Sequence, residues 1–248
     1  MPPPPAFDAR LVRARALSPS VRELVFERVD GRPMAFEPGQ WVNVFVPKWL
    51  DDGSRIKRAY SIASAPDGSP RFEIAVTRVP GGPASMWLHD AVEPGTVVPF
   101  AGPQGFFTRS PLDASPSLMV ATGTGVTPLR SMIAAASAAG SRAPIWLLLG
   151  VRHEDDVLYA EEIQALARER PFIRFEPTLS QPRGAWPGRR GYVQTHVREL
   201  WQSLAAENVG KNPHAYICGL ERMVTSVRNI LRKELNAPRE TVHAERYD

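Results

Sequence analysis

Residues 58–61 read Arg-Ala-Tyr-Ser and bring a cation, an aromatic ring and a hydroxyl together in one short segment. On a strand, Arg58 and Tyr60 point to one face and Ser61 to the other. The Arg58 guanidinium can bind a pyrophosphate through two parallel hydrogen bonds, and the Tyr60 ring can lie flat against a flavin. The Ser61 hydroxyl can then hydrogen-bond the flavin nitrogen that accepts a hydride. Taken alone, the segment fits a half-exposed strand with a surface arginine equally well.

Residues 123–128 read Gly-Thr-Gly-Val-Thr-Pro and begin 65 residues after Arg58. An apolar strand is expected before them, at residues 118–121, and a helix after them, with Thr127 as its cap and Pro128 at its first position. Glycines let the backbone approach a ligand closely, and a helix start directs N–H groups toward phosphates. Pro128 replaces the third glycine of the G-x-G-x-x-G fingerprint, so a plain strand-to-helix turn is the alternative. We expect a dinucleotide to contact Gly123, Thr124, Gly125 and Thr127.

Two further segments carry weaker signals. Gly82 ends a turn, and Ser85 lies at the start of a short expected helix, where backbone N–H groups attract phosphate. The alternative is a capped helix without a ligand. Cys218 and Gly219 close an apolar strand, and the carboxyl ends of strands in a parallel sheet face the ligand crevice. The alternative for Cys218 is a small buried hydrophobic residue.

A polar loop and the end of the chain complete the set of candidates. The loop offers a hydroxyl, a cation, an aromatic ring and an amide that can hold an adenosine 2′-phosphate: Ser180, Arg190, Tyr192 and Gln194. The alternative is an ordinary solvated loop. The chain ends in Glu-Arg-Tyr-Asp at residues 245–248. A terminal aromatic such as Tyr247 moves at low cost and suits a gate over a cofactor, whereas the alternative is a frayed end.

Composition limits the class of protein. The chain has 248 residues, 43% hydrophobic and 23% charged, as expected for one large globular domain or two ordinary ones. Its single cysteine, Cys218, excludes an internal disulfide and the four thiolates of an ordinary iron–sulfur cluster. We therefore expect a reducing, cytoplasmic location and a one-electron carrier that is a separate protein. The five histidines show no metal-ligand spacing, so no metal is expected.

Membranes and nucleic acids are not expected as partners. The longest apolar run, residues 145–151, is far shorter than the roughly 20 residues of a membrane span. Residues 2–5 are all proline, and no charged or apolar signal-peptide region accompanies them. The net charge of +4 is spread along the chain without a Lys/Arg run, which argues against nucleic acid and favours a basic face for an acidic protein.

Two kinds of scaffold must position these residues. Up to Phe107 the chain reads as short strands bounded by Pro/Gly turns, which is typical of a closed antiparallel β-barrel. After a Ser/Pro-rich linker at residues 108–117, strands alternate with helices, which predicts an α/β Rossmann-like domain with a parallel sheet. We predict a two-domain chain, with a flavin-binding barrel at residues 1–109 and a nucleotide-binding α/β domain at residues 115–248.

Together, these segments resemble the plant-type ferredoxin–NADP⁺ reductase family over nearly the whole chain from about Phe7. Each segment is weak alone, but the ordered set is specific: residues 36–40, 58–64, 82–85, 102–105, 123–131, 192–194, 218–220 and 245–247. The resemblance implies an FAD-binding barrel followed by an NAD(P)-binding domain. FAD would lie between residues 58–61 and the Ser85 turn. NAD(P)H would cross the Gly123 loop and place its nicotinamide against the flavin beside Cys218.

The resemblance also implies roles for single residues. Family members use a serine, a cysteine and a glutamate of these motifs around the hydride-transfer site, and a terminal tyrosine stacks over the cofactor. In this sequence those residues are Ser61, Cys218, Glu245 and Tyr247.

The sequence departs from the family pattern in two places. Gln181 stands where the family has an arginine after the serine of the 2′-phosphate loop, and Asp248 follows the tyrosine that is often last. Because Tyr192 and Gln194 match the NADP-type motif, NADP(H) is expected, with NAD left open.

Three functions remain open at this stage. The leading hypothesis is a monomeric, FAD-dependent oxidoreductase that transfers hydride between NADP(H) and flavin and exchanges single electrons with ferredoxin or flavodoxin. The second is an NADH-dependent reductase component of an oxygenase or another electron-transfer chain. Such components often carry a fused iron–sulfur domain, which the single cysteine excludes here. The third is a non-catalytic flavin-binding subunit of a larger complex.

Overall fold

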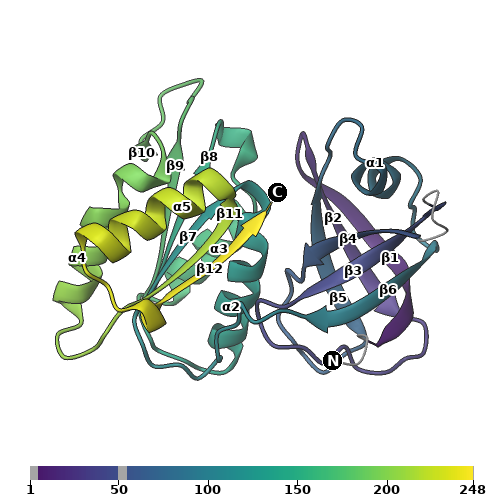
Figure 1. Ribbon diagram of the computed structural model, residues 1–248, viewed down its shortest axis with the longest axis horizontal. Coiled ribbons are helices and arrows are strands. Elements are labelled where there is room, and N and C mark those ends of the chain that lie inside the picture. Colours follow the sequence, from purple (N-terminus) through teal and green to yellow (C-terminus); the bar gives the residue numbers. More distant parts are fainter. Residues whose placement is uncertain (1–4, 50–54, 248) are drawn as a thin grey trace. The chain divides into compact units, whose positions relative to one another are not determined.

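The structure is a computed structural model that describes residues 5–49 and 55–247 (Figure 1). Most of the proline run at residues 2–5 and the final residue, Asp248, lie outside the described part of the chain. The chain divides into two compact units. The first comprises Met1–Ser110 and Arg130–Ala135, and the second Pro111–Leu129 and Ala136–Asp248.

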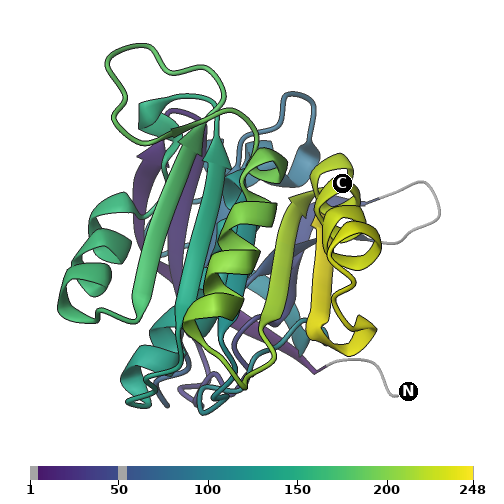
Figure 2. The same cartoon turned by 90° about the vertical axis from the view of Figure 1, so that its left-hand side faces the viewer.

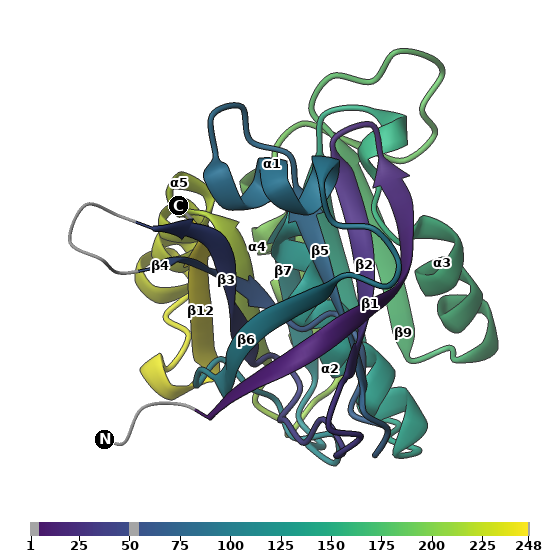
Figure 3. The ribbon, with the colours of Figure 1, turned by 90° about the vertical axis from the view of Figure 1, so that its right-hand side faces the viewer.

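The first unit is built on a six-stranded antiparallel sheet (Figure 3). Its elements in chain order are β1 (Ala6–Ser18), β2 (Val21–Arg28), β3 (Trp41–Trp49), β4 (Arg55–Ser61), β5 (Arg71–Thr77), α1 (Pro83–Asp90) and β6 (Val97–Gln104). The strand order is β4-β3-β6-β1-β2-β5. The two edge strands meet where Ile62 forms an isolated antiparallel bridge with Ile74, and the Ala63 N–H donates to the Glu73 carbonyl at 2.7 Å. The sheet is therefore barrel-like, which confirms the predicted architecture.

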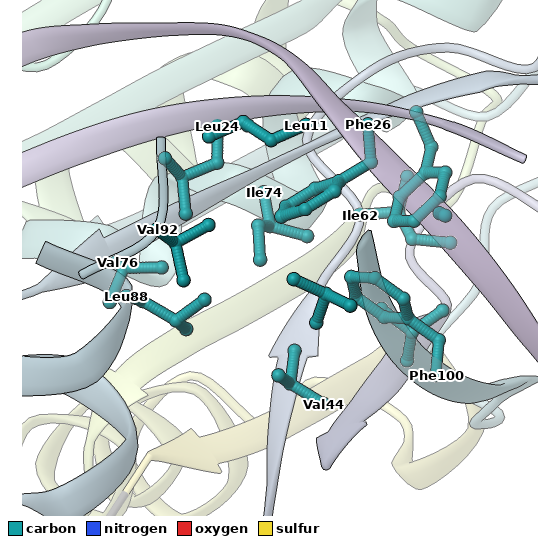
Figure 4. Close-up of a cluster of buried hydrophobic side chains, with 14 of the residues drawn as sticks. Leu11, Leu24, Phe26, Val44, Ile62, Ile74, Val76, Leu88, Val92 and Phe100 are labelled. Atoms are coloured by element: carbon teal, nitrogen blue, oxygen red, sulfur yellow. The ribbon is translucent and has the colours of Figure 1, made fainter. Parts of the chain in front are cut away.

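Four phenylalanine rings lie in the core of this unit. Figure 4 labels two of them, Phe26 and Phe100, among the other buried side chains. They come from four strands that are distant in sequence: Phe7, Phe26, Phe72 and Phe100. In five pairs of these rings, the centroids lie between 4.9 Å and 6.0 Å apart, in stacked and edge-to-face arrangements. Aromatic pairs at these distances add to the stabilisation that comes from burying apolar area. The same core includes Ile62, directly after β4, and Tyr60 packs against it, so the core supports the strand that carries candidate flavin residues.

The second unit is an α/β layer structure with a parallel sheet (Figure 2). Its strands are β7 (Ser117–Thr122), β8 (Ile145–Val151), β9 (Ile173–Leu179), β10 (Arg189–Arg190), β11 (His214–Leu220) and β12 (Val242–Tyr247). Its helices are α2 (Val126–Ala138), α3 (Ala160–Glu169), α4 (Val197–Glu207) and α5 (Glu221–Asn229). The strand order is β10-β9-β8-β7-β11-β12, and every pair is parallel. This confirms the predicted Rossmann-like class, in which ligands bind at the carboxyl edge of the sheet.

Two local predictions need correction. The helix after the glycine turn begins at Val126 and follows a 3₁₀ turn at Gly123–Gly125. Thr127 therefore lies inside the helix and does not cap it, and Pro128 is the third helical residue, not the first. Its Oγ1 donates to the Thr124 carbonyl at 2.7 Å, an option that a side-chain hydroxyl gains once the turn has formed. The alternative of a frayed end does not hold for residues 245–247, because β12 reaches Tyr247 and pairs with β11 along its length.

Two absences hold for the part of the chain that the structure describes. No helix there combines the length and the apolar character that a bilayer crossing requires. Within the same residues, no group of three or more His, Cys, Asp or Glu side chains is arranged to hold a metal ion.

Candidate functional site

Strand β4 presents the cation, the ring and the hydroxyl of the flavin segment. Arg58 is exposed, and its guanidinium donates to the Lys57 carbonyl at 2.9 Å. Tyr60 packs partly against the barrel core, and this burial raises the pKa of its phenol to about 12, with the Arg58 charge acting in the opposite direction. The phenol is therefore neutral at physiological pH. Ser61 is buried and pairs with Trp41 of β3.

The start of helix α1 supplies backbone N–H groups rather than a side-chain hydroxyl. The Ser85 hydroxyl accepts the Val79 N–H at 3.2 Å and lies 3.2 Å from the Gly82 carbonyl, so it already holds the preceding turn. A Cβ on Gly82 would lie only 2.7 Å from the Ser85 oxygen. A larger residue at this position would therefore displace the Ser85 hydroxyl from the turn. The first N–H groups of a helix lack intrahelical partners, which leaves those of Ala84 and Ser85 for an anion.

These features fit a phosphorylated flavin. The exposed Arg58 guanidinium and the N–H groups at the start of α1 can donate hydrogen bonds to a pyrophosphate. The neutral, half-buried Tyr60 ring can pack against an aromatic ring system. Each of the predicted flavin residues lies in the first unit: Arg58, Tyr60, Ser61, Gly82 and Ser85.

In the second unit, residues from three distant segments meet at the carboxyl edge of the sheet. Cys218 of β11 is fully buried and lies opposite Glu245 of β12 in the strand register. Burial and then the Glu245 charge raise the pKa of the Cys218 thiol well above its usual value, whereas hydrogen bonds from Tyr247 and from the Gly219 backbone act against the rise. The Tyr247 hydroxyl lies 3.3 Å from Thr127 Oγ1. Four predicted site residues, spread over 120 positions, thus form one cluster.

The two glycine segments of this edge lie against each other. A Cβ on Gly125 would approach the Cys218 carbonyl oxygen to 2.2 Å, and one on Gly219 would approach Thr122 Oγ1 to 2.3 Å. Gly219 also has a φ of +139°, which side-chain-bearing residues rarely adopt. Gly123, with a φ of +51°, faces open space: no atom lies within 4 Å of its notional Cβ. The backbone is therefore packed behind the turn and accessible in front of it, as a bound nucleotide requires.

A shallow hollow of about 780 Å³ adjoins this cluster. It is lined by Leu220, Glu221, Arg222, Thr225 and Tyr247. Glu221 is paired with Arg246 at 2.9 Å, whereas Leu220 and the Tyr247 ring give the hollow an apolar side. A concave surface with a few polar groups, next to the strand ends, is where a cofactor binds in this architecture.

The predicted 2′-phosphate residues come together in part. Ser180 follows β9 directly, and its hydroxyl donates to the Val151 carbonyl at 3.3 Å. Arg190 pairs with Leu179 across β9 and β10, so it lies next to Ser180, and its guanidinium is exposed. Tyr192 is 59% exposed, which leaves its ring available for stacking. Gln194 is half-buried in the short 3₁₀ turn Val193–Thr195 that follows.

The structure separates the arginines that surround this loop into two kinds. Arg189 is held by Glu176 at 3.0 Å and Glu199 at 2.8 Å, and Arg183 lies 3.3 Å from Asp155. These two have carboxylate partners. Arg152, which the sequence reading missed, has no ion-pair partner among the residues that the structure describes. It follows β8 at the carboxyl edge, and its carbonyl accepts the Gln181 N–H at 2.9 Å. Its place directly after an apolar strand was the signal that could have found it.

Comparisons with known proteins agree with this geometry. The Oxidoreductase FAD-binding domain family matches residues 8–108, and the Oxidoreductase NAD-binding domain family matches residues 119–229. The chain therefore belongs to the ferredoxin–NADP⁺ reductase family of flavoprotein oxidoreductases, as the resemblance of its motifs indicated. It is 57% identical to ferredoxin–NADP reductase B of Sorangium cellulosum, over 98% of each chain.

More distant relatives belong to oxygenase systems. The toluate 1,2-dioxygenase electron transfer component of Pseudomonas putida is 30% identical over 92% of this chain, which spans only 64% of that protein. The crystal structure of the Amycolatopsis cytochrome P450 reductase GcoB superposes with a TM-score of 0.81 at 28% identity. The superposition covers 98% of this chain and 70% of the chain of that reductase. The family is thus shared by reductases that serve different partners.

Proposed function

We propose that this protein is an NADPH-dependent FAD oxidoreductase that passes single electrons to or from a ferredoxin or flavodoxin. The observation that carries the proposal is the cluster of Cys218, Glu245, Tyr247 and Thr127 behind an accessible glycine turn. The high identity to a ferredoxin–NADP reductase over the whole chain supports the same reading. A bound flavin supplies the redox chemistry, because it takes a hydride from a nicotinamide and releases electrons one at a time.

The residues of the first unit bind and orient the flavin. Arg58 and the α1 start would hold its phosphates, the Tyr60 ring would pack on its ring system, and Ser61 would lie beside the reacting nitrogen. The phenol of Tyr60 stays neutral, so it brings no charge next to the ring. Orientation of this kind supplies much of the rate when two aromatic cofactors must react face to face.

The residues of the second unit position the nicotinamide. Gly123, Thr124, Gly125 and Gly219 would let the dinucleotide cross close to the backbone. The Cys218 thiol remains protonated and presents an uncharged side chain, and the Glu245 carboxylate lies opposite it. Tyr247 would stack at the place that the pyridine ring must enter, with its hydroxyl held toward Thr127.

Selection of NADPH over NADH would depend on exposed cations directly after β8 and on β10. Arg152 and Arg190 have no carboxylate partner among the described residues, so either guanidinium can meet a 2′-phosphate. Tyr192 would stack on the adenine. Arg152 would supply the cation that Gln181 lacks.

An acidic electron carrier suits the charge of the chain. With a net charge of +4 and a pI near 9.5, the protein attracts an acidic partner and speeds their encounter. The chain holds one cysteine, too few for the four thiolates of an ordinary iron–sulfur cluster, so these 248 residues do not supply an iron–sulfur carrier themselves. We infer a monomer that works in the cytoplasm beside such a carrier.

A second candidate function is a reductase component for an oxygenase. It is favoured by the relatives that bear such names, among them the toluate 1,2-dioxygenase electron transfer component. This chain spans only part of that protein, and its exposed Arg152 and Arg190 favour NADPH. A non-catalytic flavin-binding subunit is a third candidate that a turnover measurement would separate.

The test is steady-state turnover of the FAD-loaded protein with each nicotinamide and each class of acceptor. We expect kcat/KM to be higher with NADPH than with NADH, and reduction of a ferredoxin or flavodoxin to follow. Preference for NADH would move the protein to the oxygenase-reductase class. Absence of turnover with both nicotinamides, in a protein that retains FAD, would favour the non-catalytic subunit.

A further inference from the structure

An acidic segment after β8 holds the loop that follows β9. The Ser180 N–H donates to the Val151 carbonyl at 3.0 Å, and the Gln181 N–H donates to the Arg152 carbonyl at 2.9 Å. His153 Nδ1 lies 2.5 Å from the Gln181 carbonyl oxygen. The loop therefore continues the β8–β9 pairing beyond the ends of both strands, into the region proposed for the 2′-phosphate.

Glu154 makes the contact that fixes the next part of this loop. Its two carboxylate oxygens accept the Arg183 N–H at 3.1 Å and 3.2 Å, and one also accepts the Gly184 N–H at 3.3 Å. Hydrogen bonds from its own backbone N–H and from those of Arg183 and Gly184 lower the pKa of the Glu154 carboxyl. A carboxylate that accepts several backbone N–H groups is a strong local anchor.

Glu154 is a negatively charged residue next to the region proposed for a negatively charged 2′-phosphate. Residues 154–156 are all acidic, and a carboxylate beside a phosphate weakens phosphate binding by like-charge repulsion. Each of the three has a partner, however. Asp156 accepts the His153 N–H at 3.2 Å, and Asp155 lies 3.3 Å from the Arg183 guanidinium. The Glu154 carboxylate accepts backbone N–H groups of the loop, so its negative charge is directed at the loop backbone. We refer to this set of Glu154 hydrogen bonds as the clamp.

We propose that Glu154 is a positioning residue for recognition of a 2′-phosphorylated adenosine, acting by fixing residues 180–184. Glu154 fixes the N–H groups of Arg183 and Gly184 at one end of this loop. At its other end, the Ser180 hydroxyl donates to the Val151 carbonyl, and Arg190 lies beside it across the β9–β10 pair. Without the Glu154 hydrogen bonds, residues 180–184 would be free to move. Binding of the ligand would then have to order them, and this cost in conformational entropy would lower the affinity. The effect falls on ligands with a 2′-phosphate and spares those without one. This inference rests on the proposed preference for NADPH.

The experiment compares two small ligands on the FAD-loaded full chain. Adenosine 2′,5′-bisphosphate and adenosine 5′-diphosphate are titrated calorimetrically into the wild type and into Glu154→Ala and Glu154→Gln. We expect Glu154→Ala to weaken the 2′,5′-bisphosphate about tenfold and to leave the 5′-diphosphate unchanged. Glu154→Gln retains an acceptor oxygen and should lose less. In turnover, KM for NADPH should rise with kcat unchanged, and KM for NADH should stay the same.

Asp155→Asn is the matched control, because it removes a neighbouring negative charge and leaves the hydrogen bonds of Glu154 in place. Among the residues that the structure describes, it breaks only an exposed ion pair between Asp155 and Arg183, which contributes little to stability. It should change the ratio of the two affinities less than twofold or so. Equal weakening of both ligands by Glu154→Ala, or a lower melting temperature with no change in the affinity ratio, would overturn the inference. A wild type that does not discriminate between the two ligands would instead remove the proposed NADPH preference.

Discussion

Arg58 and Lys57 are neighbouring cations on β4, and their side chains leave the strand on opposite faces. Only Arg58 shares a face with Tyr60, so only it is placed to meet a flavin phosphate. Replacement of Arg58 by Gln should therefore raise the Kd of FAD at least tenfold, which corresponds to about 1.4 kcal/mol. Lys57→Gln removes the same charge and should leave the Kd within about twofold. Flavin fluorescence on titration into apoprotein measures both. Equal losses would show that net charge, and not the Arg58 position, matters.

Cys218 is the residue whose ionisation the fold opposes most clearly. Its pKa lies well above the usual 9.0, because the thiol is buried beside Glu245. The folded protein therefore keeps the proton while the unfolded chain releases it above about pH 9, and stability falls as pH rises past that point.

Cys218→Ala removes this pH term. The free-energy cost of the substitution should consequently be smaller at pH 10 than at pH 8, by about 1.4 kcal/mol. Urea denaturation of both proteins at the two pH values measures it. The native thiol should also resist a disulfide reagent at pH 8 and react fully once unfolded. An identical cost at both pH values, or rapid labelling of the native protein, would contradict the buried neutral thiol.

At the scale of elements, the two glycines of the turn between β7 and α2 have different roles, one in packing and one in nucleotide access. Gly125 packs on the backbone of β11, whereas Gly123 faces open space. Gly125→Ala forces a Cβ to 2.2 Å from a backbone oxygen and should cost about 3 kcal/mol or more of stability. Gly123→Ala only strains a φ of +51° and should cost about 1 kcal/mol, but its methyl enters the nucleotide space and should weaken NADP⁺ binding.

Thermal melting and NADP⁺ titration of the two variants separate these effects. The prediction fails if Gly123→Ala proves the less stable of the pair, or if its NADP⁺ affinity equals that of the wild type. Since the strain term and the clash term act on the same turn, each variant is the control for the other.

The same turn shows what sequence can and cannot predict. Its two glycines, the apolar strand before it and the helix after it are local signals, and all three were readable from residues 118–138. The role of Thr127 was not, because its hydroxyl donates back to Thr124 and meets Tyr247 only after β12 has paired with β11. Glu154 was missed for a similar reason. The N–H groups that it accepts lie 29 and 30 residues further on, and no local pattern announces such contacts.

For the whole molecule, the basic excess of charge supports the proposed acidic electron carrier. Electrostatic steering of an acidic carrier weakens as the Debye length shortens with salt. Raising the ionic strength should therefore slow reduction of an acidic ferredoxin severalfold at subsaturating concentration. Flavin reduction by NADPH, followed separately at each salt concentration, is the control. A carrier rate that does not depend on salt would argue against an acidic partner.

The most direct test of the central claim is anaerobic rapid mixing of the FAD-loaded protein with NADPH while the visible flavin absorbance is followed. The residues of the two units predict that the flavin is bleached within the turnover time, more rapidly than with NADH, and that added ferredoxin or flavodoxin restores its colour. A protein that does not hold a flavin, or whose flavin stays oxidised in excess NADPH, would contradict the account.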